Sequence, residues 1–382
     1  MKITDIKIYA AEYAQTSKSP TNKKWVFLKM ETDEGIHGWG EVGSSVNVSE
    51  NFMATAIREV SPQLIGENPM DIDRLWNKLF RMFSYMGSRG FTTSLTAGFD
   101  IALWDIKGKL SGLPVYDLLG GRYRDPVRLY CNAWFNGCYT PEEYANAAKI
   151  NVLENGHTAC KLDPFLEMTQ YHTMYQDGFI SEEGEQLGYD IVAAVRDTVG
   201  PEIEILIDAH GHYNVPNAVR ISNNLYERFN IAWFEEPVPP EGINALKQVK
   251  QNTKAPICVG ERLYTRADFI PILENNLADF IMPDTIWTGG ISEIKKIATM
   301  AEAYYIPVAP HVIPGGPLEL IAAAHVMSSV PNFYKLEHSH AFIPEHNNLL
   351  KEPYLIKDGH IHLNNKPGLG FELDESKLEE IV

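Results

Sequence analysis

The chain is short of basic residues and of long apolar runs. Its 33 Lys and Arg are outnumbered by 50 Asp and Glu, which gives a formal net charge of −17. This balance disfavours nucleic acids and anionic membranes as partners, because both are bound through clustered basic side chains. No window approaches the roughly 18 apolar residues of a membrane-spanning helix. We therefore expect neither nucleic acid nor membrane as a partner.

Cysteines are also few, and none has CxxC spacing. They are Cys131, Cys138, Cys160 and Cys258. Three of them fall in expected strands, where a small buried thiol is the usual state. The amino terminus, MKITDIKIYA, lacks the apolar stretch of a signal peptide. Both features favour a reduced, cytoplasmic protein.

Nucleotide-binding signatures are missing as well, since the chain has neither GxxxxGK[ST] nor a strand-linked GxGxxG. Gly289, Gly290, Gly315 and Gly316 lie in late loops, where a phosphate is often bound in barrel proteins. Glycines beside helix starts are more often plain turns, so they indicate a phosphate site only weakly.

With 382 residues, 45% of them hydrophobic and 22% charged, the chain can form one large domain and a smaller one. Apolar spacing predicts an α+β unit over residues 1–125. Its expected elements are strands at 3–11 and 25–32, a turn at 35–40, and helices at 49–61, 69–82 and 92–110.

Strands and helices then alternate, as in a parallel α/β barrel. Strands are expected at 127–134, 158–162, 203–208, 231–235, 257–260, 280–282, 307–309 and 333–337. Helices are expected at 141–154, 185–199, 215–228, 243–251, 266–274, 292–303 and 318–328. Eight strands with seven intervening helices suit a closed barrel over residues 126–350. Residues 351–382 are expected to return to the first domain through a hairpin at PYLIKDGHIHL.

Three acidic residues, Asp208, Glu235 and Glu261, close the strand-like runs EIEILID, IAWFEE and PICVGE. The gaps between them, 235 − 208 = 27 and 261 − 235 = 26, are typical of βαβ units. In such units the carboxyl ends of the strands meet at one edge of the barrel. Oxygen ligands there suit a hard cation, so the spacing predicts a Mg²⁺ site.

Other polar residues stand at the same edge. Lys161 and Asp163 end the second barrel strand and are expected to point the same way, towards the barrel axis. Lys161 could be a base or an electrostatic partner for substrate; the alternative is a structural ion pair between Lys161 and Asp163. His210 follows Asp208 by two residues and is a candidate for acid/base work or for orienting a ligand. His212 is an alternative in that role, although it lies further from the strand end.

Asp284 and His311 end the sixth and seventh strands, so they are expected to touch across the rim. A carboxylate on one imidazole nitrogen fixes the tautomer and raises the basicity of the other, which makes His311 the best candidate for removing a proton. Glu337 ends the eighth strand. If it holds a proton it can hydrogen-bond an oxygen that gains charge; a salt bridge with His338 or His340 is the alternative.

Seven blocks of sequence, in this order, carry a resemblance to a known family. They are AGFDIALWDIKGKLSGLPVYDLLGG, KLDPF, DAHG, WFEEP, VGER, MPD and APH. They resemble the enolase superfamily in its mandelate racemase-like branch, and specifically its sugar-acid dehydratases of the gluconate and galactonate type. The resemblance covers essentially the whole chain. It implies an α+β capping domain over a modified (β/α)₇β barrel that holds one Mg²⁺ per subunit.

In this superfamily a Lys or His base works with Mg²⁺ to stabilise an enediolate. By resemblance, His311 removes the proton α to the carboxylate and His210 protonates the departing C3 hydroxyl, which gives a 2-keto-3-deoxy acid. Asp163, Arg262 and His212 are then expected to bind substrate. Racemases of the branch have Lys-x-Lys where this chain has Lys161 and Asp163, which argues against that activity.

Two other functions stay open at this stage. One is a racemase or epimerase with Lys161 and His311 on opposite faces of the substrate, and the other is a sugar-acid binding protein without catalysis. The choice of sugar acid is expected to depend on residues 14–24 and 44–51, the region around Arg89, and the long loop at 163–184. Relatives are dimers or octamers, so a homo-oligomer is expected.

Overall fold

The structure is a computed structural model that describes residues 1–13, 23–43, 49–170, 174–312 and 314–381. The predicted specificity segments at 14–24 and 44–51 therefore lie largely outside the described residues, as do residues 171–173 of the 163–184 loop.

A small antiparallel sheet opens the chain. Its strands are β1 (Ile3–Tyr13), β2 (Lys23–Thr32), β3 (His37–Val42) and, from the far end of the chain, β13 (Glu379–Glu380), in the order β13-β1-β2-β3. The turn predicted at 35–40 is wrong, because the reversal is complete at Gly35 and the residues from His37 on pair with β2. Glycine stands at position 40 for another reason: a Cβ there would lie 1.9 Å from the carbonyl oxygen of Gly98, so it permits close packing of a helix on β3.

The helices predicted for this region are confirmed. They are α1 (Glu50–Val60, followed by the 3₁₀ turn Ser61–Gln63), α2 (Ile72–Met82) and α3 (Phe91–Ser111). The short α4 (Val115–Leu118) was not predicted. Ser49 begins α1 by accepting a hydrogen bond from the Phe52 amide, and Gly112 ends α3 in the left-handed region. Helix α3 lies between the small sheet and the barrel and is buried along most of its length.

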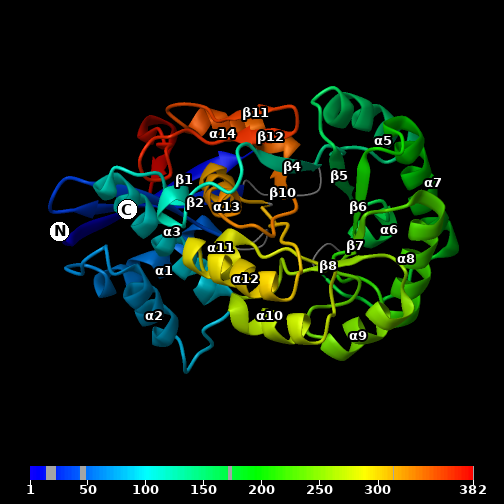
Figure 1. The fold of residues 1–382 in the computed structure, drawn as a ribbon, viewed down its shortest axis with the longest axis horizontal. Coiled ribbons are helices and arrows are strands. Elements are labelled where there is room, and N and C mark those ends of the chain that lie inside the picture. Colours follow the sequence, from blue (N-terminus) through cyan, green and yellow to red (C-terminus); the bar gives the residue numbers. More distant parts are fainter. Residues whose placement is uncertain (14–22, 44–48, 171–173, 313, 382) are drawn as a thin grey trace.

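The second part of the chain is the predicted modified barrel, with helices α5 to α10 around its outside (Figure 1). Its strands are β4 (Val127–Asn132), β5 (Ala159–Leu162), β6 (Glu204–Asp208), β7 (Trp233–Glu235), β8 (Ile257–Val259), β9 (Phe280–Ile281) and β10 (Leu336–Ser339). Its helices are α5 (Pro141–Ala148, continued by a π-turn Lys149–Leu153), α6 (Leu166–Thr169), α7 (Glu182–Val199), α8 (Val215–Phe229), α9 (Ile243–Asn252), α10 (Thr265–Glu274), α11 (Thr285–Thr288), α12 (Ile291–Ala303) and α13 (Pro317–Ser328). No helix of the described residues is long and apolar enough to cross a bilayer.

Strands β4 to β9 pair in parallel in chain order, and β10 pairs in parallel with β4. The strand predicted at 307–309 is reduced to single bridges from Val308 to Ile281 on one side and Phe333 on the other. The strand predicted at 333–337 is displaced towards the carboxyl terminus, because the residues around Phe333 make only that bridge and β10 begins at Leu336.

An apolar layer fills the barrel interior below its rim. It is formed by Tyr130, Ala159, Leu206, Trp233, Cys258, Met282 and Ala309. Side chains two residues apart on a strand share a face, so the residues that follow these by two positions point into the barrel one layer higher. Those positions hold polar residues on almost every strand, Lys161 and Glu235 among them. The sequence thus builds an apolar floor with a polar site on top.

The hairpin predicted at residues 353–363 is formed by β11 (Leu355–Lys357) and β12 (His360–His362), after the 3₁₀ turn His340–Phe342 and α14 (Ile343–Leu349). It does not join the first domain as expected, because β12 pairs with the barrel strand β4. The chain reaches the first sheet later, past the 3₁₀ turn Glu375–Lys377, where β13 pairs with β1. The boundaries at residues 125 and 350 stay a prediction.

Two buried carboxylates of the first domain cap helices of the barrel. Asp100, on α3, accepts hydrogen bonds from the amide and hydroxyl of Ser292 at the start of α12, at 2.9 and 2.6 Å. Glu41, on β3, accepts from the amides of Gly316 and Glu319 at the start of α13, at 2.5 and 3.1 Å. The late glycine loops that weakly suggested phosphate binding therefore present their helix amides to the protein's own carboxylates.

Candidate active site

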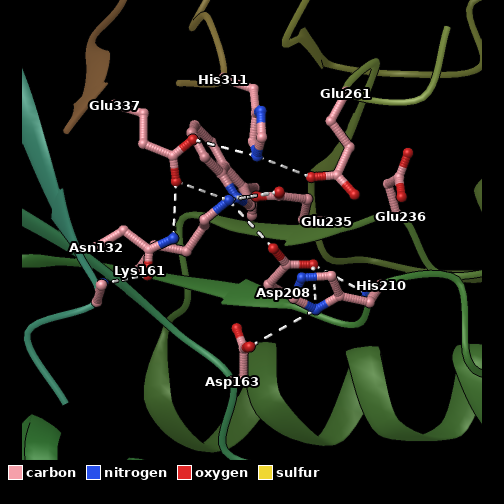
Figure 2. Close-up of polar contacts among 12 residues, drawn as sticks. Asn132, Lys161, Asp163, Asp208, His210, Glu235, Glu236, Glu261, His311 and Glu337 are labelled. Carbon is pink, nitrogen blue, oxygen red and sulfur yellow. Dashed lines mark hydrogen bonds and ion pairs between the residues drawn. The ribbon is translucent and has the colours of Figure 1, made fainter. Parts of the chain in front are cut away.

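The three strand-end acids meet. Asp208 and Glu235 lie opposite each other in the β6–β7 register, and Glu261 follows β8. One carboxylate oxygen from each lies within 4.8 Å of the others, and all three side chains are buried. Figure 2 shows them around the end of Lys161. Buried, convergent and all-oxygen, this donor set suits a hard divalent cation.

Lys161 on β5 is the positive charge at the centre of the site. Its Nζ lies 2.7 Å from Glu235, 3.1 Å from Asp208 and 3.0 Å from Glu337. Burial lowers the pKa of this ammonium, but the three carboxylates outweigh it and hold the pKa well above the usual lysine value. Lys161 therefore carries its charge in this arrangement, and its partners are these acids and not Asp163.

One ammonium cannot balance the buried acids. Burial, followed by the neighbouring Asp208 carboxylate, raises the pKa of Glu235 well above its usual value. Burial also acts on Asp208, but His210 and Lys161 outweigh it and lower its pKa. The cluster therefore carries more negative charge than Lys161 offsets, and a divalent cation bound here would supply the missing positive charge. The chemistry of the cluster fits Mg²⁺.

His311 and Asp284 form a pair at the rim, as predicted. His311 Nδ1 lies 2.7 Å from an Asp284 oxygen, and the two residues share a β-bridge. His311 Nε2 faces the site, 3.1 Å from Glu261 and 3.7 Å from Glu337. Burial lowers the pKa of His311, but Glu337, Glu261 and Asp284 together outweigh it and raise the pKa to about 9.

A further acid, Glu319, stands behind this pair and was not predicted. It is fully buried, and neither of its carboxyl oxygens accepts a hydrogen bond from a donor within the described ranges. Burial and then Asp284 raise its pKa well above the usual value, and its contact with Asp284 is a hydrogen bond only when one of the two holds a proton. Gly315 leaves it room, since a Cβ there would lie 1.2 Å from a Glu319 oxygen.

His210 lies on the opposite side of the cluster, next to Asp163. Its backbone has φ +47°, a strained value that turns the imidazole back over Asp208. Its Nδ1 is 3.3 Å from Asp208 and 3.7 Å from Asp163 (Figure 2). Burial lowers the pKa of His210, but Asp208 and Asp163 outweigh it and raise the pKa above the usual value. His212 is buried, with its ring centroid 6.0 Å from that of His210.

Glu337 completes the ring from β10. It accepts hydrogen bonds from Asn132 Nδ2 at 2.8 Å and the Val312 amide at 3.1 Å, besides its ion pair with Lys161. The alternative of a salt bridge to His338 is wrong, because adjacent residues of a strand face opposite sides and His338 packs against His157 outside the barrel.

Arg262, predicted to bind substrate, pairs with Glu236. Its Nε donates to a Glu236 oxygen at 2.6 Å and lies 3.6 Å from Glu261. Burial and Glu261 raise the pKa of Glu236 to about 8, against the lowering effect of Arg262. Glu236 was missed although it stands beside Glu235 in WFEEP, because strand alternation assigns only one of two adjacent residues to the interior. Its positive φ of +38° breaks that alternation.

Comparison with known proteins agrees with this fold. Residues 6–120 match the family described as "Mandelate racemase / muconate lactonizing enzyme, N-terminal domain", and residues 143–377 match "Enolase C-terminal domain-like". The chain therefore belongs to the mandelate racemase/muconate lactonizing enzyme family of the enolase superfamily.

Individual relatives resemble the whole chain. A D-galactonate dehydratase from Pectobacterium atrosepticum is 36% identical over 100% of this chain and 94% of its own. A D-xylonate dehydratase from Haloferax volcanii is 35% identical over 96% of this chain and 87% of its own. The crystal structure of a mandelate racemase/muconate lactonizing enzyme-like protein from Rubrobacter xylanophilus superposes with a TM-score of 0.88, at 36% identity over 98% of this chain and 96% of that one.

Proposed function

We propose that the chain is a Mg²⁺-dependent dehydratase of sugar acids, a hydro-lyase that converts an aldonic or aldaric acid into a 2-keto-3-deoxy acid. One observation carries the proposal: the His311–Asp284 pair and the His210–Asp163 pair face each other across the carboxylate cluster. Relatives named for D-galactonate and D-xylonate support the substrate class.

Asp208, Glu235 and Glu261 would hold the metal. Bound there, Mg²⁺ would act as a Lewis acid towards the substrate carboxylate and make its α-proton more acidic. The charged Lys161 and the Glu337 carboxyl lie 3.0 Å apart at the same place, where negative charge develops on the substrate. We assign Lys161 an electrostatic role; Glu337 would donate a hydrogen bond to the oxygen that gains charge only in its protonated form.

His311 is the proposed base. Asp284 orients the ring through Nδ1, so Nε2 is the nitrogen that takes the proton from C2. His210 is the proposed acid: the carboxylates beside it favour its protonated form, and it would give that proton to the departing C3 hydroxyl. The C2–H and C3–O bonds break, water leaves, and the enol product rearranges to the keto acid. His212 is more deeply buried than His210, which favours His210 in this role.

Substrate binding is assigned to Asp163, Arg262 and His212, as the sequence resemblance implies. Asp163 faces His210, so it would orient that ring as well as meet a substrate hydroxyl. The Arg262 side chain is about 25% exposed beside Glu261, which leaves part of its guanidinium available to a ligand. A homo-oligomer, dimer or octamer, stays a prediction.

A racemase or epimerase is the second candidate, with Lys161 and His311 as bases on two faces. The chain has Asp163 where racemases of this branch have the second lysine of Lys-x-Lys, which argues against it. Dehydration yields a keto acid, whereas racemisation would return substrate with deuterium from the solvent at C2. A binding protein without catalysis would yield neither.

The test is a screen of C5 and C6 aldonic and aldaric acids with Mg²⁺, read as keto-acid formation. His311→Asn should abolish turnover on the best substrate while the protein still binds Mg²⁺, since His311 is not among the proposed ligands. His362→Asn, on the hairpin strand β12 away from the carboxylate cluster, is the matched control and should keep full activity. Unchanged turnover in His311→Asn would remove this residue from the mechanism.

A further inference from the structure

Outside the barrel wall, a second group of metal-ligand side chains converges. Cys131 on β4, His157 before β5 and His340 after β10 each bring one donor atom within 4.8 Å of the others. His338 adjoins them, since its Nε2 lies 3.3 Å from His157 Nε2. None of these residues takes part in the chemistry proposed above.

The backbone holds three of these residues in fixed places. His338 lies directly opposite Cys131 in the parallel β10–β4 register. His157 precedes β5, the strand that neighbours β4 on its other side. Because Glu337 faces the barrel interior, His338 faces outward, so a wall of strands separates this group from the carboxylate cluster.

One ring nitrogen of each histidine in this group lacks a hydrogen-bond partner among the described residues. The Nδ1 atoms of His157, His338 and His340 are buried and make no hydrogen bond to any residue that the structure describes. A buried polar group left unsatisfied costs about 1–3 kcal/mol, and each case in a native protein calls for an explanation such as an ion or a water. A bound metal would explain why three unpartnered ring nitrogens lie beside one thiol.

The rings are in the state that a metal needs. Burial lowers the pKa of His157 to about 4 and the pKa of His338 well below the usual value. Both shifts favour the neutral imidazole, the form whose ring nitrogen can bind a metal. His340 is partly exposed, and this leaves a route from solvent to the buried thiol.

We propose that Cys131, His157 and His340 form a structural site for a thiolate-binding divalent metal, of which Zn²⁺ is the best match, with a fourth position left for water or the adjoining His338. Thiolate and imidazole donors favour zinc over Mg²⁺. Such a metal would clamp the last barrel strand, β10, to the first, β4.

Cobalt(II) is the probe for the test. The full-length protein is stripped with a chelator, given excess Mg²⁺ and titrated with Co²⁺. We expect about one equivalent of Co²⁺ to produce a thiolate-to-cobalt charge-transfer band and the strong visible bands of tetrahedral cobalt. The carboxylate cluster has no sulfur and cannot give the charge-transfer band, so the two sites are distinguished. A wild-type protein without that band overturns the proposal.

Variants locate the site. Cys131→Ser should abolish the charge-transfer band, whereas Cys160→Ser, which changes the buried cysteine opposite it in the β4–β5 register, should keep it. His340→Ala, on a partly exposed turn, should weaken Zn²⁺ binding by at least about 100-fold, because loss of a group that merely supports a ligand already costs about 10–100-fold. If Cys131→Ser does not fold, the wild-type spectrum and His340→Ala decide. A band that survives Cys131→Ser, or an unchanged affinity in His340→Ala, would refute the site.

Discussion

Replacing Lys161 by Met should strengthen Mg²⁺ binding and stop turnover. The Lys161 ammonium lies 2.7 Å from Glu235 and 3.1 Å from Asp208, two of the proposed ligands, so it competes with an added cation for their charge. The repulsion between a divalent ion and an ammonium roughly 5 Å apart is about 7 kcal/mol at an effective dielectric constant of ~20. Methionine has nearly the same length and removes that repulsion.

Part of the gain is lost to protonation. The pKa of Glu235 is already raised, and loss of the ammonium raises it further, so protonation of Glu235 competes with Mg²⁺ more strongly. We expect a net gain of about 10- to 100-fold in Mg²⁺ affinity, or about 1.4–2.8 kcal/mol. Turnover should still fall by more than about 100-fold, because a charge aimed at the developing oxyanion is lost.

Calorimetric titration of the chelator-treated proteins with Mg²⁺ measures the first effect, and keto-acid formation measures the second. Lys335→Met is the matched control. Lys335 is also a fully buried lysine, but it pairs with Glu204 and not with the cluster, so its loss should leave Mg²⁺ affinity unchanged. Weaker Mg²⁺ binding in Lys161→Met would show that the ion does not share carboxylates with Lys161, and the proposed ligand set would fail.

Three further predictions concern single side chains. Burial raises the pKa of Asp100 to about 7, above its unfolded value of about 3.8, so its ionisation costs the folded state up to about 4 kcal/mol as pH rises from 4 to 7. Asp100→Asn removes this cost. The free energy of unfolding of the variant, measured with denaturant, should therefore rise relative to that of the wild type between pH 4 and pH 7. Parallel pH profiles of the two proteins would contradict the raised pKa of Asp100. Glu319→Gln keeps a hydrogen-bond donor towards Asp284 and should keep kcat within about threefold of wild type. Glu319→Leu should lower kcat by about 10- to 100-fold, because a hydrogen bond to a charged group contributes about 1.5–3 kcal/mol. Equal losses in both variants would show that Glu319 does not donate a hydrogen bond to Asp284. His210→Asn should still exchange the C2 proton of the substrate for deuterium, as measured by NMR, but should release no keto acid. If the variant loses both reactions, His210 is not the acid.

Much of the fold was predictable because it follows from short-range regularities. Helix periodicity located α1, α2 and α3, and the repeated strand–helix spacing gave the barrel with Asp208, Glu235 and Glu261 at its rim. The wrong predictions concern residues whose structure depends on packing between segments that are distant in the sequence. Gly40 signals a turn by composition, yet it lies inside a strand because α3 packs against it. No local pattern carries that information.

The candidate site divides in the same way. Residues at strand ends, such as His311, could be predicted from position alone, and Asn132 at the end of β4 could have been found by the same rule. Glu319 could not, because it lies in the first turn of α13, where an acid is ordinary, and its burial against Asp284 depends on the tertiary fold. Glu236 required knowledge of a backbone angle that sequence does not fix.

The carboxylates that reach from the small domain onto α12 and α13 restrict how this enzyme can be re-engineered. The small domain is not interchangeable: one grafted from a relative would have to supply acids in the places of Glu41 and Asp100, or two barrel helices would begin with amides that have no hydrogen-bond acceptor. Chimeras that keep both acids should be recovered from expression far more often than those that lose them.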